Sequence, residues 1–177
     1  KNKYDTFFRK LPKRTIRSFF PDGEMDKDDF DGENSSLEKA RQMILNDHLP
    51  LIQWLQKLPF YYETENQIFV HAGILEDAGE WWKDETPEEY LLEKLPPETG
   101  TFYKDIIAGH VSSAVVADDW TYLGKVYWDG KSHYYIDGNT RKSKVIPVLK
   151  FNKNSGAYTS FEQVAKGRWV EYLVNGK

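Results

Sequence analysis

Two short apolar segments, each of which runs directly into a histidine and a glycine, constrain the fold of this chain most strongly. They are Ile68–Gly73, which reads Ile-Phe-Val-His-Ala-Gly, and Ile106–His110, which reads Ile-Ile-Ala-Gly-His. Short apolar runs of this kind predict buried β-strands. In a layered α/β fold the ends of such strands present side chains to a ligand crevice, and a neighbouring glycine permits close approach. The sequence therefore predicts an α/β (α+β) fold with both histidines at strand ends.

The first third of the chain is predicted to be mainly helical. Apolar residues recur at helical spacing over 35–44 and again over 48–58, with Pro50 early in the second helix, where its missing N–H costs nothing. Basic and aromatic residues alternate over 1–20, which favours an amphipathic helix over a nucleic-acid surface. The acidic stretch 22–33 predicts a solvated loop.

The remainder of the chain is predicted to be a β-sheet with helices on one side. Phe60–Glu63 and Gln67–Val70 predict a hairpin, and Asp129-Gly130 predicts a tight turn between two further strands. Strands are also expected over Val145–Phe151 and from Tyr158 onward, and a polar, partly helical segment over 76–103. We expect a single domain over 1–177, mainly helical with an acidic loop in 1–58 and mainly sheet in 59–177.

The composition excludes several classes of protein. The chain has 177 residues with 40% apolar content and a net charge of −4, and its Lys and Arg are scattered, so we expect a folded domain that does not bind nucleic acid. There is no apolar run long enough to span a bilayer, and no cysteine for a disulfide or a thiolate metal site. We expect no membrane partner and a cytoplasmic location.

His71 and His110 are the candidate metal ligands. Two neutral imidazoles brought together from two strands suit Zn, Mn or Fe, although a histidine at a strand end is also a common hydrogen-bonded core residue. Asp137 closes a predicted strand, either as a turn residue or as a partner that orients a metal-bound histidine. His133 is predicted to face outward from its strand.

Covalent catalysis has no recognisable apparatus in this sequence. Cysteine is absent, and so are the nucleophile elbow, the P-loop and the dinucleotide-binding glycine motif, while Ser112 and Ser113 carry no mark of activation. Attack by a metal-activated water is the chemistry that remains, since it requires few local motifs beyond the ligands.

Four segments in this order resemble the second half of bacterial calcineurin-like metallophosphoesterases, in the branch similar to serine/threonine protein phosphatases. The resemblance covers roughly residues 48–152. The segments that carry it are Leu58–Glu63, Ile68–Ile74, Ile107–His110 and Tyr135–Gly138.

The resemblance implies a site as well as a fold. It implies that His71 and His110 ligate the second of two divalent metal ions (Mn, Fe or Zn), that Gly73 and Gly109 lie close to the site, and that Asp137 is at most an outer partner. It also implies part of a four-layer α/β/β/α sandwich, a mixed β-sheet with flanking helices.

The sequence departs from the family in three ways. The first-half motifs, which supply the bridging Asp, the ligands of the first metal and the catalytic His, are absent, so we expect a missing N-terminal half and no catalytic residue in this chain. The family's Gly-His-Thr-Pro is Gly-His-Val-Ser here. No Arg lies between His71 and His110, so Lys94 is considered as a substitute that binds phosphate, without the bidentate grip of a guanidinium.

The predicted function of the parent protein is metal-dependent phosphoester hydrolysis by a dinuclear, metal-activated water, with a phosphorylated protein or a small phosphoester as substrate. Hydrolysis of dinucleoside polyphosphates is an alternative within the same family. A non-catalytic binding module, or an inactive fragment, is the alternative from another class.

Overall fold

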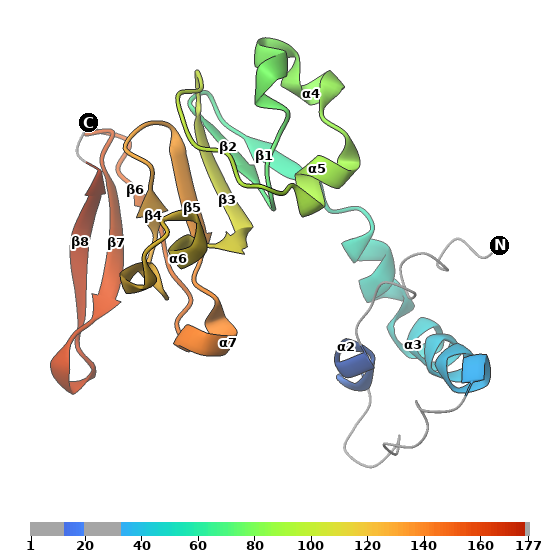
Figure 1. The fold of residues 1–177 in the computed structure, drawn as a ribbon. Coiled ribbons are helices and arrows are strands. Elements are labelled where there is room, and N and C mark those ends of the chain that lie inside the picture. Colours follow the sequence, from blue (N-terminus) through green and yellow to red (C-terminus); the bar gives the residue numbers. More distant parts are fainter. Residues whose placement is uncertain (1–12, 20–32, 176–177) are drawn as a thin grey trace. The chain divides into compact units, whose positions relative to one another are not determined.

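The structure is a computed structural model, which describes residues 13–19 and 33–175 (Figure 1). It divides into two compact units, 1–58 and 59–177, which we treat separately as unit 1 and unit 2. The acidic stretch predicted as a loop falls almost entirely outside the described residues. Within the described ranges, no helix is both long and apolar enough to cross a membrane.

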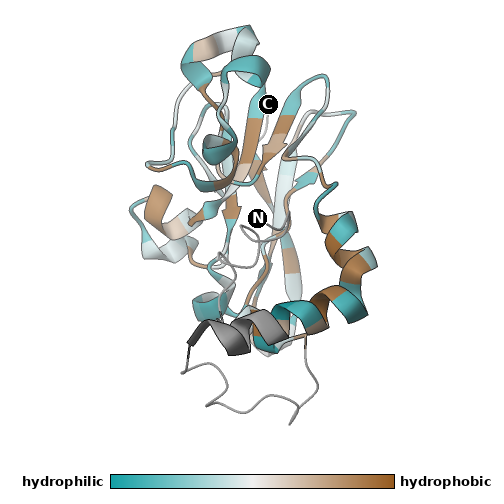
Figure 2. Ribbon diagram, turned by 90° about the vertical axis from the view of Figure 1, so that its right-hand side faces the viewer, coloured by the Kyte–Doolittle hydropathy of each residue, from teal (hydrophilic) through white to brown (hydrophobic). Residues whose placement is uncertain are grey.

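Unit 1 contains helix α2 (Lys13–Arg17) and the longer helix α3 (Glu33–Leu55). Helix α3 is interrupted at His48, whose backbone is not helical (φ −126°, ψ 17°), two residues before Pro50. This break agrees with the predicted pair of helices, because proline lacks the N–H for a helical hydrogen bond and its ring clashes with the preceding turn. Apolar and polar bands alternate along the drawn part of α3 in Figure 2, and Ala40, Ile44 and Ile52 are fully buried.

The main sheet of unit 2 has five strands in the order β1-β2-β3-β5-β4. Strands β2, β3 and β5 are parallel, while β1 and β4 pair antiparallel at the two edges. The bounds are β1 (Tyr61–Glu63), β2 (Gln67–Val70), β3 (Asp105–Ser112), β4 (Tyr127–Trp128) and β5 (His133–Asp137). The predicted mixed sheet is confirmed, together with both hairpins. The three parallel strands end at one edge of the sheet, which we call the carboxyl edge.

Short helices pack on one face of this sheet. Trp82 and Leu91, together with the partly buried Val116, join Ile68 and Ile106 in one hydrophobic cluster. Trp82, Leu91 and Val116 come from α4 (Trp82–Glu85), α5 (Glu88–Glu93) and α6 (Ser113–Val116), respectively. The turns of 3₁₀ helix are η2 (Glu76–Trp81), η3 (Trp120–Tyr122) and η4 (Ala165–Gly167).

A second sheet packs on the other face. It contains β6 (Lys150–Phe151), β7 (Tyr158–Gln163) and β8 (Trp169–Asn175), all antiparallel. Tyr158 of β7 lies in a cluster with Ile107 and Tyr134 of the first sheet, and the ring centroids of Tyr134 and Tyr158 are 4.3 Å apart. Unit 2 thus has a helical layer and two stacked sheets.

The prediction of a strand over Val145–Phe151 is wrong for most of that segment. Only its last two residues form a regular strand, β6. Pro147 lies in the middle of the segment and cannot donate a ladder hydrogen bond. Pro147 instead packs closely on Gly138, where an added Cβ would lie 2.6 Å from the proline Cδ. The chain between these two residues forms a turn that includes helix α7 (Thr140–Ser143).

Candidate functional site

The two predicted ligands lie side by side at the carboxyl edge. His71 directly follows β2, His110 lies near the end of β3, and these strands pair in parallel with Val70 opposite Ala108. The N–H of Gly109 donates to the carbonyl of His71 at 2.9 Å, which links the two strand ends. The imidazole centroids are 5.2 Å apart with an interplanar angle of 64°. Residues far apart in the chain are therefore brought into ring contact.

His110 has an unusual backbone conformation. Its φ is +62°, in the left-handed region that residues other than glycine seldom occupy. The pairing of β3 with β5 is interrupted between Ala108 and Ser112, so His110 sits in an irregular part of the strand. Such irregularities re-aim side chains and cluster at functional sites, because the surrounding structure must hold them. The position of the imidazole of His110 is thus determined by an irregular strand end.

The side chain of Asp137 forms a hydrogen bond within the turn that follows β5. It ends β5 opposite Ser112, and its Oδ1 accepts a hydrogen bond from the N–H of Asn139 at 2.7 Å. The neighbouring Ser113 donates its hydroxyl to the carbonyls of Tyr135 and Asp137, at 2.9 and 3.1 Å. These bonds tie the end of β3 to the end of β5, so Asp137 and Ser113 support the edge that carries the histidines.

The histidine pair supplies two ligand groups. Imidazole nitrogen suits Zn, Mn and Fe, and both rings lie where a strand end meets solvent. Across residues 13–19 and 33–175, no group of three or more His, Cys, Asp or Glu side chains is placed to hold a metal ion. The pair therefore fits part of a metal centre.

Lys94 does not fit the role of a free phosphate-binding cation. Its side chain is only 6% exposed, and its Nζ donates to the carbonyl of Ile74 and forms an ion pair with Glu98 at 2.5 Å. Glu76 lies 3.9 Å from the same ammonium. The prediction is corrected because burial forces this ammonium to take protein partners, and those partners occupy it.

His133 is buried, so the prediction that it faces outward is wrong. Its side chain is 2% exposed, because β5 is covered by the helical layer on one face and by the second sheet on the other. Nδ1 lies 3.0 Å from the carbonyl of Gly100 and 3.1 Å from Asp129, and Nε2 lies 3.0 Å from Glu76. Since these partners are acceptors when both carboxyls are ionised, only the doubly protonated ring satisfies both nitrogens.

The pKa values in this cluster shift together. Burial alone lowers the pKa of His133, but the hydrogen bond and charge of Glu76, with the charge of Asp129, outweigh it and raise that pKa. Burial alone raises the pKa of Glu76, and the contact with His133 outweighs it and lowers that pKa. Burial and the nearby Glu76 raise the pKa of Glu98. Of these partners, only Asp129 lies close to His133 in the sequence, four residues before it.

Gly73 and Gly109 have different structural roles. A Cβ on Gly73 would lie 2.6 Å from Cδ of Lys94, whereas a Cβ on Gly109 would lie 3.5 Å from the carbonyl oxygen of His71, an ordinary contact. We expect Gly73→Ala to lower the free energy of unfolding by about 1–3 kcal/mol through overpacking. Gly109→Ala is the matched control, with an expected change within about 1 kcal/mol. Chemical denaturation followed by NMR signals of unit 2 measures both, and equal losses would contradict the assignment.

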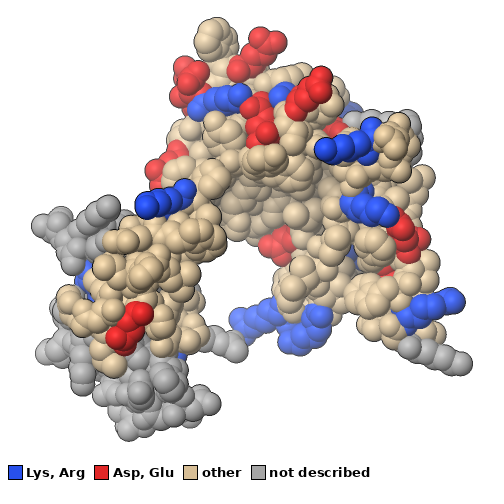
Figure 3. All heavy atoms as spheres, turned by 180° about the vertical axis from the view of Figure 1, so that it is seen from behind, with Lys and Arg blue, Asp and Glu red and all other residues tan. Residues whose placement is uncertain are grey.

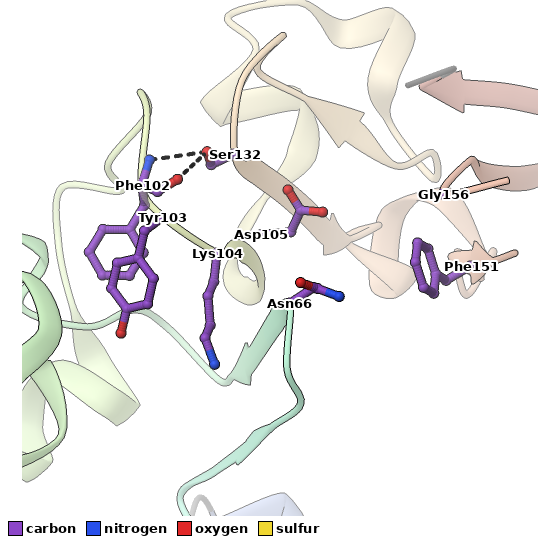
Figure 4. A pocket seen from close by; sticks show the side chains of 8 residues that line it. All are labelled: Asn66, Phe102, Tyr103, Lys104, Asp105, Ser132, Phe151 and Gly156. Carbon is purple, nitrogen blue, oxygen red and sulfur yellow. Dashed lines mark hydrogen bonds between the residues drawn. The ribbon is translucent and has the colours of Figure 1, made fainter. Parts of the chain in front are cut away.

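A cavity of about 340 Å³ lies at the opposite edge of the sheet, where the parallel strands begin (Figure 4). Polar groups around it already bond within the protein. Ser132 exchanges hydrogen bonds with the backbone of Phe102, Lys104 bonds to Glu63, and Asp105 accepts from Tyr158. The lining residues are Asn66, Phe102, Tyr103, Lys104, Asp105, Ser132, Phe151 and Gly156. This cavity is separate from the histidine pair and lends it no support.

Both blue Lys and Arg side chains and red Asp and Glu side chains are visible in Figure 3. Comparisons with protein-family models, curated proteins and solved structures found no match to this chain.

Proposed function

We propose that this chain forms part of the active site of a metal-dependent phosphoesterase, in which His71 and His110 ligate one of two divalent metal ions. The observation that carries the proposal is the pair of imidazoles, 5.2 Å apart at the carboxyl edge of parallel strands. This edge is where open α/β sheets bind their ligands. The left-handed backbone of His110 adds support, since such an outlier is retained where it aims a side chain.

His71 and His110 are suitable ligands for such a metal ion, and two ligands are enough for only part of a two-metal centre. Two neutral imidazoles suit Mn, Fe or Zn, and the remaining ligands would come from outside residues 13–19 and 33–175. Bound divalent ions supply Lewis-acid stabilisation of phosphoryl oxygens and a water of lowered pKa. The helical layer and two stacked sheets of unit 2 would belong to a four-layer α/β/β/α sandwich.

The substrate class in this proposal is a phosphomonoester, on a protein or on a small molecule. The role of this chain is to hold His71 and His110 in a fixed relation through the Gly109–His71 backbone bond and the paired strands β2 and β3. Lys94 is assigned no contact with the phosphate, because Glu98 and the carbonyl of Ile74 occupy its ammonium.

A non-catalytic binding module is the second candidate. It is favoured by the absence of a larger ligand group from residues 13–19 and 33–175. Exposed aromatic side chains of unit 2 also favour it, such as Trp81 at 70% and Trp120 at 63% exposure. A module of this kind would use its surface and not the histidine pair, so metal binding by the pair separates the two candidates.

Zinc titration of the chain tests the proposal directly. We expect Zn²⁺ to shift the ring NMR signals of His71 and His110 together, and His71→Ala to weaken binding at His110 by at least about tenfold, since even outer partners of a metal contribute roughly 10–100-fold. His48→Ala is the matched control, because His48 lies in unit 1 beside Phe19. Equal effects of the two substitutions would exclude the pair as the ligand site.

A further inference from the structure

The turn that follows His71 is held by a segment that comes later in the chain. The N–H of Ala72 donates to the carbonyl of Leu91 at 3.0 Å, and the N–H of Leu75 donates to the hydroxyl of Thr86, also at 3.0 Å. Lys94 adds a third bond, from its ammonium to the carbonyl of Ile74. The residues directly after the candidate ligand are therefore fixed by contacts with α5 and its flanks.

Lys94 contacts this turn with its whole side chain. Its Cδ lies against Gly73, so closely that a Cβ there would be 2.6 Å away, and its ammonium reaches the carbonyl of the next residue. A lysine is seldom so buried unless its charge is paired. Glu98 at 2.5 Å and Glu76 at 3.9 Å provide that pairing, and they hold the ammonium under the turn.

The contacts continue from the turn to the second histidine. The carbonyl of His71 accepts the N–H of Gly109 at 2.9 Å, and Gly109 precedes His110. A shift of the turn at Gly73 and Ile74 would be transmitted to the backbone of His71 two residues earlier, and so to the separation of the two imidazoles. Ligand groups must be held within a fraction of an ångström for tight binding, which makes such support important.

We infer that Lys94 is a positioning residue for His71, and that it sets the distance between the two imidazoles through the turn at Gly73 and Ile74. The inference rests on the proposed function, in which these imidazoles share a metal ion. It assigns the buried cation a role at the site without contact with substrate.

Copper binding to the histidine pair is the test. The probe is Cu²⁺ held by iminodiacetate, which leaves coordination positions open for imidazole nitrogen. Lys94→Met keeps the apolar stem against Gly73 and removes the ammonium. We expect this variant to bind the probe about tenfold more weakly, since orienting partners contribute roughly 10–100-fold to metal affinity. We also expect the electron paramagnetic resonance spectrum of the bound Cu²⁺ to change. Lys83→Met is the matched control, because Lys83 pairs with Glu63 and is 45% exposed.

A purely structural role for Lys94 predicts a different result. In that case Lys94→Met would lower stability while affinity and spectrum stay as in the unaltered chain, and the inference would be overturned. If Lys94→Met fails to fold, Glu98→Gln weakens the same anchor from a side chain that is 46% exposed, and a smaller loss of affinity is expected. If Lys94→Met does not fold, and a folded Glu98→Gln variant binds the probe with unchanged affinity, the inference is also overturned.

A double-substitution cycle adds a second measurement. Gly73→Ala should weaken probe binding when Lys94 is present, because the added Cβ would clash with Cδ of Lys94. In a Lys94→Ala background that clash is removed, so Gly73→Ala should weaken probe binding less. If the two substitutions act independently on affinity, coupling through the turn is contradicted. Failure of the proposed function is recognised separately, because the unaltered chain would then bind the probe no better than His71→Ala does.

Discussion

Replacement of His133 by alanine is expected to destabilise unit 2 by about 3–5 kcal/mol, because it removes one partner from a buried cluster of charged side chains. Asp129 would lose the proton donor that its Oδ2 faces at 3.1 Å, and Glu76 would lose the donor at 3.0 Å. The measurement is amide hydrogen exchange in the main sheet, for example at Ile106, whose N–H donates to the carbonyl of Ser132 at 2.8 Å. Faster exchange throughout the sheet is the expected result.

The control for this variant is Lys131→Ala in the same hairpin, since Lys131 is exposed and only its backbone contacts Asp129. That substitution should change stability by no more than about 0.5 kcal/mol. A loss from His133→Ala as small as that from the control would mean that the buried cluster adds nothing to the fold.

The same cluster predicts how stability depends on pH. The pKa of His133 is raised above its ordinary 6.5, so its contribution is complete below pH 6.5 and is lost as the pH rises through the folded-state value. The pKa of Glu76 is lowered below 4.5, so its contribution is present above pH 4.5 and is lost as the pH falls. The raised pKa of Glu98 favours the folded state at low pH, as that of His133 does. Stability should therefore decline above pH 6.5, and His133→Gln should remove most of that decline.

Under the proposed function, His71→Ala and His110→Ala in the parent protein are each expected to lower turnover by about 10²–10³-fold. Loss of a ligand removes Lewis-acid stabilisation worth several kcal/mol, and each 1.36 kcal/mol is a factor of ten. Manganese-dependent hydrolysis of p-nitrophenyl phosphate measures the effect, and metal content should fall in parallel. Normal metal content in both variants would contradict the ligand assignment.

The chain of 177 residues tested alone provides the matching control. Because the described residues contain two proposed ligands and no group of three or more, the chain alone should show no turnover that a chelator abolishes. Chelator-sensitive turnover by the chain alone would show that it completes the centre by itself or with a second copy. His48→Ala in the parent protein should keep full activity, because the imidazole of His48 packs beside Phe19 and is not a proposed ligand.

Local patterns in the sequence determined much of the main sheet. The apolar runs that end at His71 and His110 predicted two buried strands, and the Asp129-Gly130 turn predicted the hairpin of β4 and β5. Strand alternation and turn chemistry act over a few residues, so they are readable from the chain. The proximity of the two histidines was expected on the same basis, and the parallel pairing of β2 and β3 accounts for it.

Tertiary structure alone decided the state of the charged residues. His133 was predicted to face outward, yet both faces of β5 are covered, and Lys94 was considered for phosphate binding, yet Glu98 and the carbonyl of Ile74 hold it. Burial of a side chain depends on which distant segments pack over it, and that information is spread over the whole chain. The left-handed backbone of His110 likewise comes from the irregular pairing of β3 with β5, a long-range contact that no local pattern encodes.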